Sequence, residues 1–337
     1  MENYGLIHKN DPRDWILGAE TDDSGFINID DWYKYFPTKE KQHSTYFDTK
    51  GCATFAILNQ SETAFNYLVK DKIFSQDNIN WLNDNGYIDE NGNVNFSDRF
   101  CLIQNGTTRK GNYFTQVYNS AFDEETGTGL IPESMLPYPV TQRTPVFDWD
   151  DFYNPDVITD EMKKLGKEFL RRFTINYYRV NQSKENRDKY LKGCPLVCGV
   201  STGCAHLSTC SINSNHAILY YTEKLIDAPD YLQKYFEKGL PLFDSYESRD
   251  KDFLRQVNPD YKFPDNMRAI KIKENIMTNV KIIANKSKGK ELGFYEPIKS
   301  EEAFESRCEN YGLPVPRTAD GDINWDKVKI DGETNIK

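Results

Sequence analysis

Three residues of the chain combine a reactive side chain with a position beside an apolar stretch, and the first is Cys52. It follows Gly51 and opens an apolar segment with helical periodicity. A thiol in the first turn of a helix lies near backbone N–H groups and the positive end of the helix dipole. Both favour the thiolate and can bind the oxyanion formed when it attacks a carbonyl carbon. The pattern predicts a nucleophile at Cys52, and the alternative is a buried thiol that acts as a small hydrophobic residue.

A thiolate nucleophile needs a base that holds its proton and later protonates the leaving amine, and that base is usually histidine. The chain has four histidines. His216 is the polar residue that opens the apolar segment 217–221, so its side chain can face a cleft while the strand behind it stays rigid. We predict that His216 is the base. His43, which is closer to Cys52 in the sequence, is the rival, and a strand-edge histidine without a role is the alternative.

The third residue is Asp244, a carboxylate within the apolar segment 242–246. Burying a carboxylate costs free energy unless it has a partner, and a catalytic histidine needs an acceptor that fixes its tautomer. Asp244 is therefore the candidate acceptor for the ring N–H of His216. The alternative is an ordinary aspartate on the surface.

The elements that must position these residues follow from periodicity and capping residues. We predict helices from about residue 52, at 75–85, at 111–122, from 159 with a buried stripe that ends at Phe173, and at 183–192. We predict strands at 194–201, 216–222, 240–246, 269–273 and 280–284, and a hairpin at 86–96 around Asn91-Gly92. Helices first and strands second indicate an α+β protein, with a helical half that carries the nucleophile packed against a strand-rich antiparallel half.

Composition excludes several classes of partner. Of the 337 residues, 28% are charged and 38% hydrophobic, which is typical of a globular protein. The formal net charge of −10 disfavours nucleic acid and anionic membranes as partners. The chain has no run of about 18 apolar residues, so we predict that it does not insert into a membrane. The first residues lack the apolar core of a signal peptide, which predicts cytoplasmic synthesis.

The segments around the three residues resemble the papain-like (cathepsin-type) cysteine peptidases, in that family's order of cysteine, histidine, then amide or acid. Residues 51–56, GCATFA, resemble its C-W-x-F-[AS] helix start, and residues 215–217, NHA, match its N-H-A strand. Residues 244–246, DSY, resemble its N-S-W with Asp in place of Asn. The resemblance implies a papain-like α+β fold. It also implies hydrolysis of a protein or peptide substrate by Cys52, His216 and Asp244, without a cofactor.

The resemblance also assigns residues near the nucleophile. In the family a glutamine shortly before the cysteine completes the oxyanion hole together with the N–H of the cysteine. The nearest glutamine here is Gln42, ten positions before Cys52, which is longer than the usual spacing. The alternative for Gln42 is a solvated residue beside a charged run. Residues 105–111 resemble the family's glycine-rich substrate-binding turn, in which Gly111 or Gly106 would let the substrate backbone approach closely.

A narrower resemblance concerns residues 11–18, DPRDWILG, and 97–100, SDRF, which are similar to divergent members encoded in bacteriophage genomes. It implies association with a virion or a cell wall. Two alternatives to a general peptidase stay open: an endopeptidase or amidase that acts on peptidoglycan peptides, and a catalytically silent papain-fold scaffold or virion protein.

The resemblance also predicts the domain organisation. The peptidase core would span 31–250, with its helix-rich half at about 45–192 and its strand-rich half at about 193–250. Residues 1–30 would form an N-terminal extension. Residues 251–337 would form a C-terminal extension that contains strands and then becomes irregular.

A zinc site is the main rival use of the cysteines, which number seven. The pattern C-x3-C-x5-C-x-H-x3-C is formed by Cys194, Cys198, Cys204, His206 and Cys210. Only its first pair fits the spacing of structural zinc sites, and that pair could equally be small core residues of a strand. We therefore assign no metal site.

Overall fold

The computed structural model describes residues 6, 32–43, 47–137, 149–180, 183–200, 216–245, 254–263, 267–275, 305, 315 and 317. The chain divides into two compact units, Met1–Leu170 with Ile175–Ile272, and Arg171–Thr174 with Lys273–Lys337. In the second unit, Asn275 donates hydrogen bonds to the Arg171 carbonyl over 2.9 Å and to the Arg172 carbonyl over 2.8 Å. The residues predicted to do chemistry all belong to the first unit.

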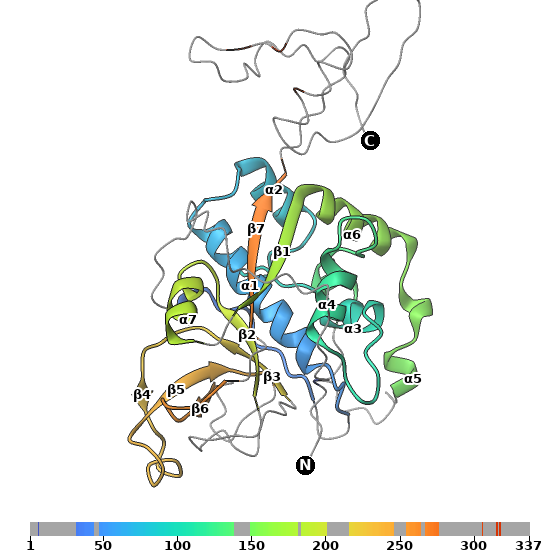
Figure 1. Cartoon of the computed structure of the whole chain (residues 1–337). Helices are drawn as coiled ribbons and strands as arrows, with labels where there is room; N and C mark the ends of the chain where they lie inside the picture. The colour runs from blue at the N-terminus through green and yellow to red at the C-terminus, as the bar shows by residue number, and fades with distance from the viewer. Residues whose placement is uncertain are drawn as a thin grey trace, which may run out of the picture. The chain divides into compact units, whose positions relative to one another are not determined.

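The first unit is built around helix α1, Cys52–Lys70, which packs against helices α3 (Asp98–Gln104) and α4 (Phe114–Phe122) on one side and strands β2 and β3 on the other (Figure 1). Every residue of α1 from Cys52 to Tyr67 is buried. A helix buried all round must satisfy its polar side chains internally. Gln60 accordingly donates to the Pro195 carbonyl over 2.6 Å, and Asn59 donates to Ser245 Oγ over 2.7 Å. These bonds fix the position of α1 against the strand-rich half.

The remaining helices surround this core. They are η1 (Tyr33–Tyr35), α2 (Gln76–Asp84), η2 (Glu133–Met135), α5 (Trp149–Phe152), η4 (Pro155–Val157), α6 (Asp160–Arg172) and α7 (Lys184–Leu191). The predicted helices that begin after Ser75 and Ser183 are confirmed as α2 and α7. In each, the serine Oγ accepts an N–H of the first turn, from Asn78 over 3.4 Å and from Asn186 over 3.3 Å.

Two predicted helix limits are wrong. Helix α4 begins at Phe114 rather than at Gly111, because Gly111 has φ +95° and closes a turn in which its N–H donates to the Thr108 carbonyl over 2.7 Å. Helix α6 ends at Arg172, and Phe173 is the first residue of strand β1, Phe173–Val180. Phe173 is buried as predicted, but in a strand, where the following β-branched and aromatic residues pack well.

The strand-rich half is a seven-stranded sheet in the order β1-β7-β2-β3-β5-β4, with β6 paired to β5. Its further strands are β2 (Leu196–Val200), β3 (His216–Tyr220), β4 (Ile226–Asp227), β5 (Lys238–Phe243), β6 (Leu254–Val257) and β7 (Met267–Glu274). The pairings of β2 with β3 and β7, and of β5 with β3, β4 and β6, are antiparallel.

The predicted α+β class, with a helical half that carries Cys52 packed against an antiparallel strand-rich half, is confirmed. Strands β6 and β7 belong to the same sheet although they lie beyond the predicted core limit at residue 250. The strand predicted at 280–284 lies outside the described residues.

Candidate active site

Cys52 is the first residue of α1, directly after the N-cap residue Gly51. The Gly51 carbonyl accepts the Phe55 N–H over 3.0 Å and so begins the helix. A Cβ on Gly51 would lie 2.3 Å from Leu102 Cδ2 of helix α3. A side chain at the cap would therefore displace the buried Leu102 side chain, so the packing of α3 favours glycine at this position.

His216 opens strand β3, which packs against α1. The N–H of the next residue, Ala217, donates to Cys52 Sγ over 3.4 Å. This contact joins residues 165 positions apart in the chain. It places the thiol beside the backbone that carries His216, so two of the predicted residues meet where the helical half touches the sheet.

Asp244 directly follows β5, the neighbour of β3 in the sheet. His216 Nε2 and Asp244 Oδ1 are 2.7 Å apart, and both side chains are buried. With Nε2 bonded to the carboxylate, proton exchange between the imidazole and the thiol would use Nδ1. The structure thus pairs the side chains of His216 and Asp244 and brings the Cys52 thiol to the backbone next to His216. The rival base His43 forms a backbone bridge to Asp48.

A fourth side chain, Arg255, is not anticipated from the sequence. Its Nε contacts Asp244 Oδ2, the carboxylate oxygen that does not bond His216. Arg255 lies on β6, opposite Leu242 of β5, and that strand pairing carries it to the carboxylate. A lone arginine in a short segment beyond the predicted core carries no sequence signal, because its role depends on which strand β6 pairs with.

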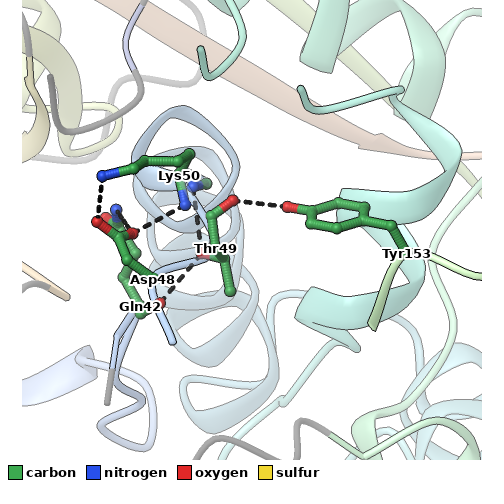
Figure 2. A network of polar contacts seen from close by, with 6 residues as sticks. Gln42, Asp48, Thr49, Lys50 and Tyr153 are labelled. Atoms are coloured by element: carbon green, nitrogen blue, oxygen red, sulfur yellow. Dashed lines mark hydrogen bonds and ion pairs between the residues drawn. The ribbon is translucent and has the colours of Figure 1, made fainter. Parts of the chain in front are cut away.

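Gln42 is fully buried and is held at both its backbone and its side chain. Its N–H donates to the carbonyl of Ser245, the residue after Asp244, over 3.0 Å. Its Nε2 donates to Asp48 Oδ1 over 3.3 Å, and its carbonyl accepts from Thr49 Oγ1 over 3.0 Å (Figure 2). The solvated alternative for Gln42 is therefore wrong, because these bonds hold the carboxamide inside the protein.

The long spacing between Gln42 and Cys52 is accommodated because Asp48 and Thr49 lie beside Gln42 and His43. Asp48 accepts the Lys50 N–H over 2.8 Å and pairs with Lys50 Nζ over 2.7 Å (Figure 2). Tyr153 Oη donates to the Thr49 carbonyl over 2.7 Å from outside the loop. Together with the bond from Thr49 Oγ1 to the Gln42 carbonyl, these contacts hold Thr49 beside Gln42. Thr49 lies three positions before the nucleophile.

The electrostatics of the thiol differ from what the helix start alone predicts. Burial raises the pKa of Cys52, whose residue surface is 1% exposed, and the negative charges of Asp244 and Asp48 raise it further. The N–H groups of Ala217 and Ala53 lower the pKa but do not outweigh burial. Burial therefore opposes the thiolate expected from the helix start, because a buried charge loses its hydration.

The predicted substrate-binding glycines lie in a turn beside α1. Gly106 and Gly111 both have positive φ, +67° and +95°. Between α3 and this turn, Asn105 donates to Thr54 Oγ1 over 2.8 Å, two residues after the nucleophile. A side chain at Gly106 would have nothing within 4 Å, so the backbone there is open to an approaching chain. The role of Gly106 and Gly111 in binding substrate stays a prediction.

The zinc hypothesis falls partly on residues that are not described. Cys204, His206 and Cys210 lie outside the described residues. Cys194 and Cys198 are buried free thiols, and Cys194 Sγ accepts the Ile270 N–H over 3.3 Å. Among the residues that the structure describes, no three His, Cys, Asp or Glu side chains form a group suited to a metal ion. Within the same residues, no helix has the length and apolar character needed to cross a membrane.

Known proteins that match this chain were found among solved structures. No family model and no curated protein sequence matches the chain. Among solved structures, the chain is similar to the proform of a cysteine protease that is a major ragweed pollen allergen, with 14% identity, TM-score 0.43, and coverage of 75% of this chain and 68% of that one. It is similar to recombinant stem bromelain precursor, with 12% identity, TM-score 0.43, and coverage of 80% and 77%. It is also similar to xylellain, a cysteine protease from Xylella fastidiosa, with 17% identity, TM-score 0.45, and coverage of 80% and 96%.

Proposed function

We propose that the chain is a papain-like cysteine peptidase in which Cys52 is the nucleophile, His216 the general base and acid, and Asp244 the residue that orients His216. One observation carries the proposal. A thiol at a helix N-terminus accepts the N–H of Ala217, next to an imidazole whose far nitrogen is 2.7 Å from a buried carboxylate. A nucleophile, a base and a group that orients the base are the parts that acyl transfer through cysteine requires.

The mechanism follows from these contacts. Cys52 Sγ attacks the carbonyl carbon of a peptide bond as its proton passes to His216 Nδ1. The oxyanion that forms accepts the Cys52 N–H and the second hydrogen of Gln42 Nε2, because the first is donated to Asp48. The C–N bond then breaks, and the leaving amine takes the proton from His216. Water next gives a proton to His216 and attacks the thioester. Sγ leaves with that proton, and the acid is released.

Burial of the thiol shapes the first step. Because burial raises the pKa of Cys52, we propose that His216 removes the proton during the attack rather than long before it. The Ala217 N–H, which favours negative charge on sulfur, would stabilise the thiolate as it forms.

The test uses the buried thiols of the chain as internal controls. Iodoacetamide alkylation, read by mass spectrometry across pH, would compare Cys52 with Cys101, which is also buried with a raised pKa. We expect Cys52 to react faster than Cys101, and we expect that excess to vanish in His216→Ala while the rate at Cys101 stays unchanged. Equal rates at both thiols, unaffected by the substitution, would refute a base-activated nucleophile.

Turnover would then identify the substrate class. Wild type and Cys52→Ser would be compared on an unfolded protein and on peptidoglycan peptides. Cleavage of the first by wild type alone supports a general peptidase. Cleavage of only the second supports the cell-wall enzyme that a bacteriophage origin would favour. An alkylation pattern of an activated thiol with neither substrate cleaved would contradict the proposed activity on both classes.

A further inference from the structure

The carboxylate of Asp244 contacts two basic side chains at once. Oδ1 is 2.7 Å from His216 Nε2, and Oδ2 contacts Nε of Arg255. The carboxylate is almost completely buried, at 1%, whereas the Arg255 side chain is 23% exposed. The guanidinium therefore contacts the carboxylate oxygen that the imidazole does not, and it belongs to a side chain that reaches the solvent.

This arrangement changes what the imidazole experiences. A carboxylate alone behind a histidine presents a full negative charge, which holds the proton of the imidazolium tightly. A guanidinium on the second oxygen offsets much of that charge. What remains at His216 is an oriented hydrogen-bond acceptor of small net charge, as a neutral carboxamide would be. The papain-like family, by the resemblance given above, has an asparagine at this position.

Several charged or titratable groups lie around the imidazole in the described part of the chain. They include Asp244 after β5, Arg255 on β6 and the Cys52 thiol on α1, which in turn feels the charge of Asp48 before α1. Arg255 is the one permanent positive charge in this set. Its removal would leave the Asp244 carboxylate without that counter-charge, while Asp48 keeps its ion pair with Lys50.

We propose that Arg255 is a positioning and tuning residue that acts through Asp244, so that the Asp244–Arg255 pair does the work of a neutral carboxamide. The pair orients His216 yet lets it release its proton to the leaving amine and then accept one from water. The inference rests on the proposed function for its catalytic meaning. The pairing itself sets the proton affinity of the imidazole whether or not the protein turns over a substrate.

The test is a cycle of substitutions read by NMR titration of the His216 ring signals, in a Cys52→Ser background so that the thiol does not titrate with the ring. Arg255→Gln keeps an N–H donor for Asp244 Oδ2 but removes the charge. We expect the titration midpoint of the ring to move up by about one pH unit, about tenfold in proton affinity. Asp244→Asn alone leaves the guanidinium uncompensated and is expected to move the midpoint down.

The double variant Asp244→Asn with Arg255→Gln is expected to return the midpoint close to its starting value. Arg255→Lys, which keeps the charge, is expected to keep it there as well. Opposite shifts of the single variants, cancelled in the double variant, support the proposal. Equal effects of Arg255→Gln and Arg255→Lys, or no shift in either, would overturn it and leave Arg255 a structural contact.

Kinetics supply the second readout. Because His216 accepts the thiol proton during the attack, it must be unprotonated in the active enzyme. In the protein with Cys52 intact, the acid limb of kcat/KM for Arg255→Gln should therefore move to higher pH with KM little changed. Because the titration does not depend on turnover, a failed peptidase assay with the expected midpoint shifts would refute the function but not the pairing. Expected turnover with unshifted midpoints would refute the pairing alone.

Discussion

Replacing Glu62 with glutamine is expected to stabilise the protein at neutral pH. Glu62 is a buried residue of α1, and its Oε1 accepts the Phe96 N–H over 2.8 Å. Two further carboxyl groups, Glu40 and Asp98, lie beside it and hydrogen-bond to each other. Burial raises the pKa of all three groups, and the charge of Glu40 raises those of Glu62 and Asp98 further. Arg99, the residue after Asp98, donates hydrogen bonds to the backbone carbonyls of Phe152 and Asp151.

The sign and size of the effect follow from proton linkage. A hydrogen bond between two carboxyl groups requires a proton on one of them, and the unfolded chain releases such protons near pH 4. Because the folded-state pKa values are raised, the stability is fully present below that pH and is lost as pH rises through the folded-state values. Each extra proton held by the folded state lowers the free energy of unfolding by about 1.4 kcal/mol per pH unit. One proton held from pH 5 to pH 7 therefore corresponds to a loss of about 2.7 kcal/mol.

Urea unfolding at pH 5, 6 and 7 measures this directly. We expect the free energy of unfolding of wild type to fall as pH rises. Glu62→Gln keeps an oxygen to accept the Phe96 N–H, so its decline should be shallower and its stability at pH 7 higher by about 1–3 kcal/mol. The exposed Glu161 on α6 provides a matched control, and Glu161→Gln should follow wild type. A wild-type stability that stays flat or rises from pH 5 to 7 would refute the reasoning, as would an unchanged slope in Glu62→Gln.

Three further changes test the architecture around the nucleophile. Gln42→Ala should lower kcat by about 10²–10³ with little change in KM, as for loss of one oxyanion donor, and an unchanged kcat would remove Gln42 from the oxyanion hole. Gly51→Ala, whose Cβ would meet Leu102 Cδ2 at 2.3 Å, should destabilise the fold by about 1–3 kcal/mol in thermal or urea unfolding. A neutral result would mean that the Leu102 side chain can turn away without loss of packing. Tyr153→Phe removes the 2.7 Å bond to the Thr49 carbonyl and should cost about 0.5–1.5 kcal/mol in the same assay; no loss would show that the loop holds itself.

Local features of this chain could be predicted because they depend on residues within one turn of each other. The helix that starts at Cys52 and the serine caps of α2 and α7 are of this kind, since a cap and the N–H groups it satisfies are neighbours in the sequence. The α+β class followed from the same local patterns taken in order. The limits at Gly111 and Phe173 were missed because a turn bond in one case and sheet pairing in the other overrode helical periodicity.

The sequence by itself determined which side chains could form a nucleophile, a base and an acid. Residue types and the apolar character of the flanking segments are local properties that can be read directly from the sequence. Only the tertiary structure decided which of them meet. The pairing of β3, β5 and β6 brings Asp244 between His216 and Arg255. Bonds with Asp48 and Thr49 hold Gln42 beside the residues that precede Cys52 despite the long spacing in the sequence. The burial that raises the pKa of Cys52 was likewise invisible in the sequence. Each of these depends on contacts between distant segments, whose geometry no local pattern specifies.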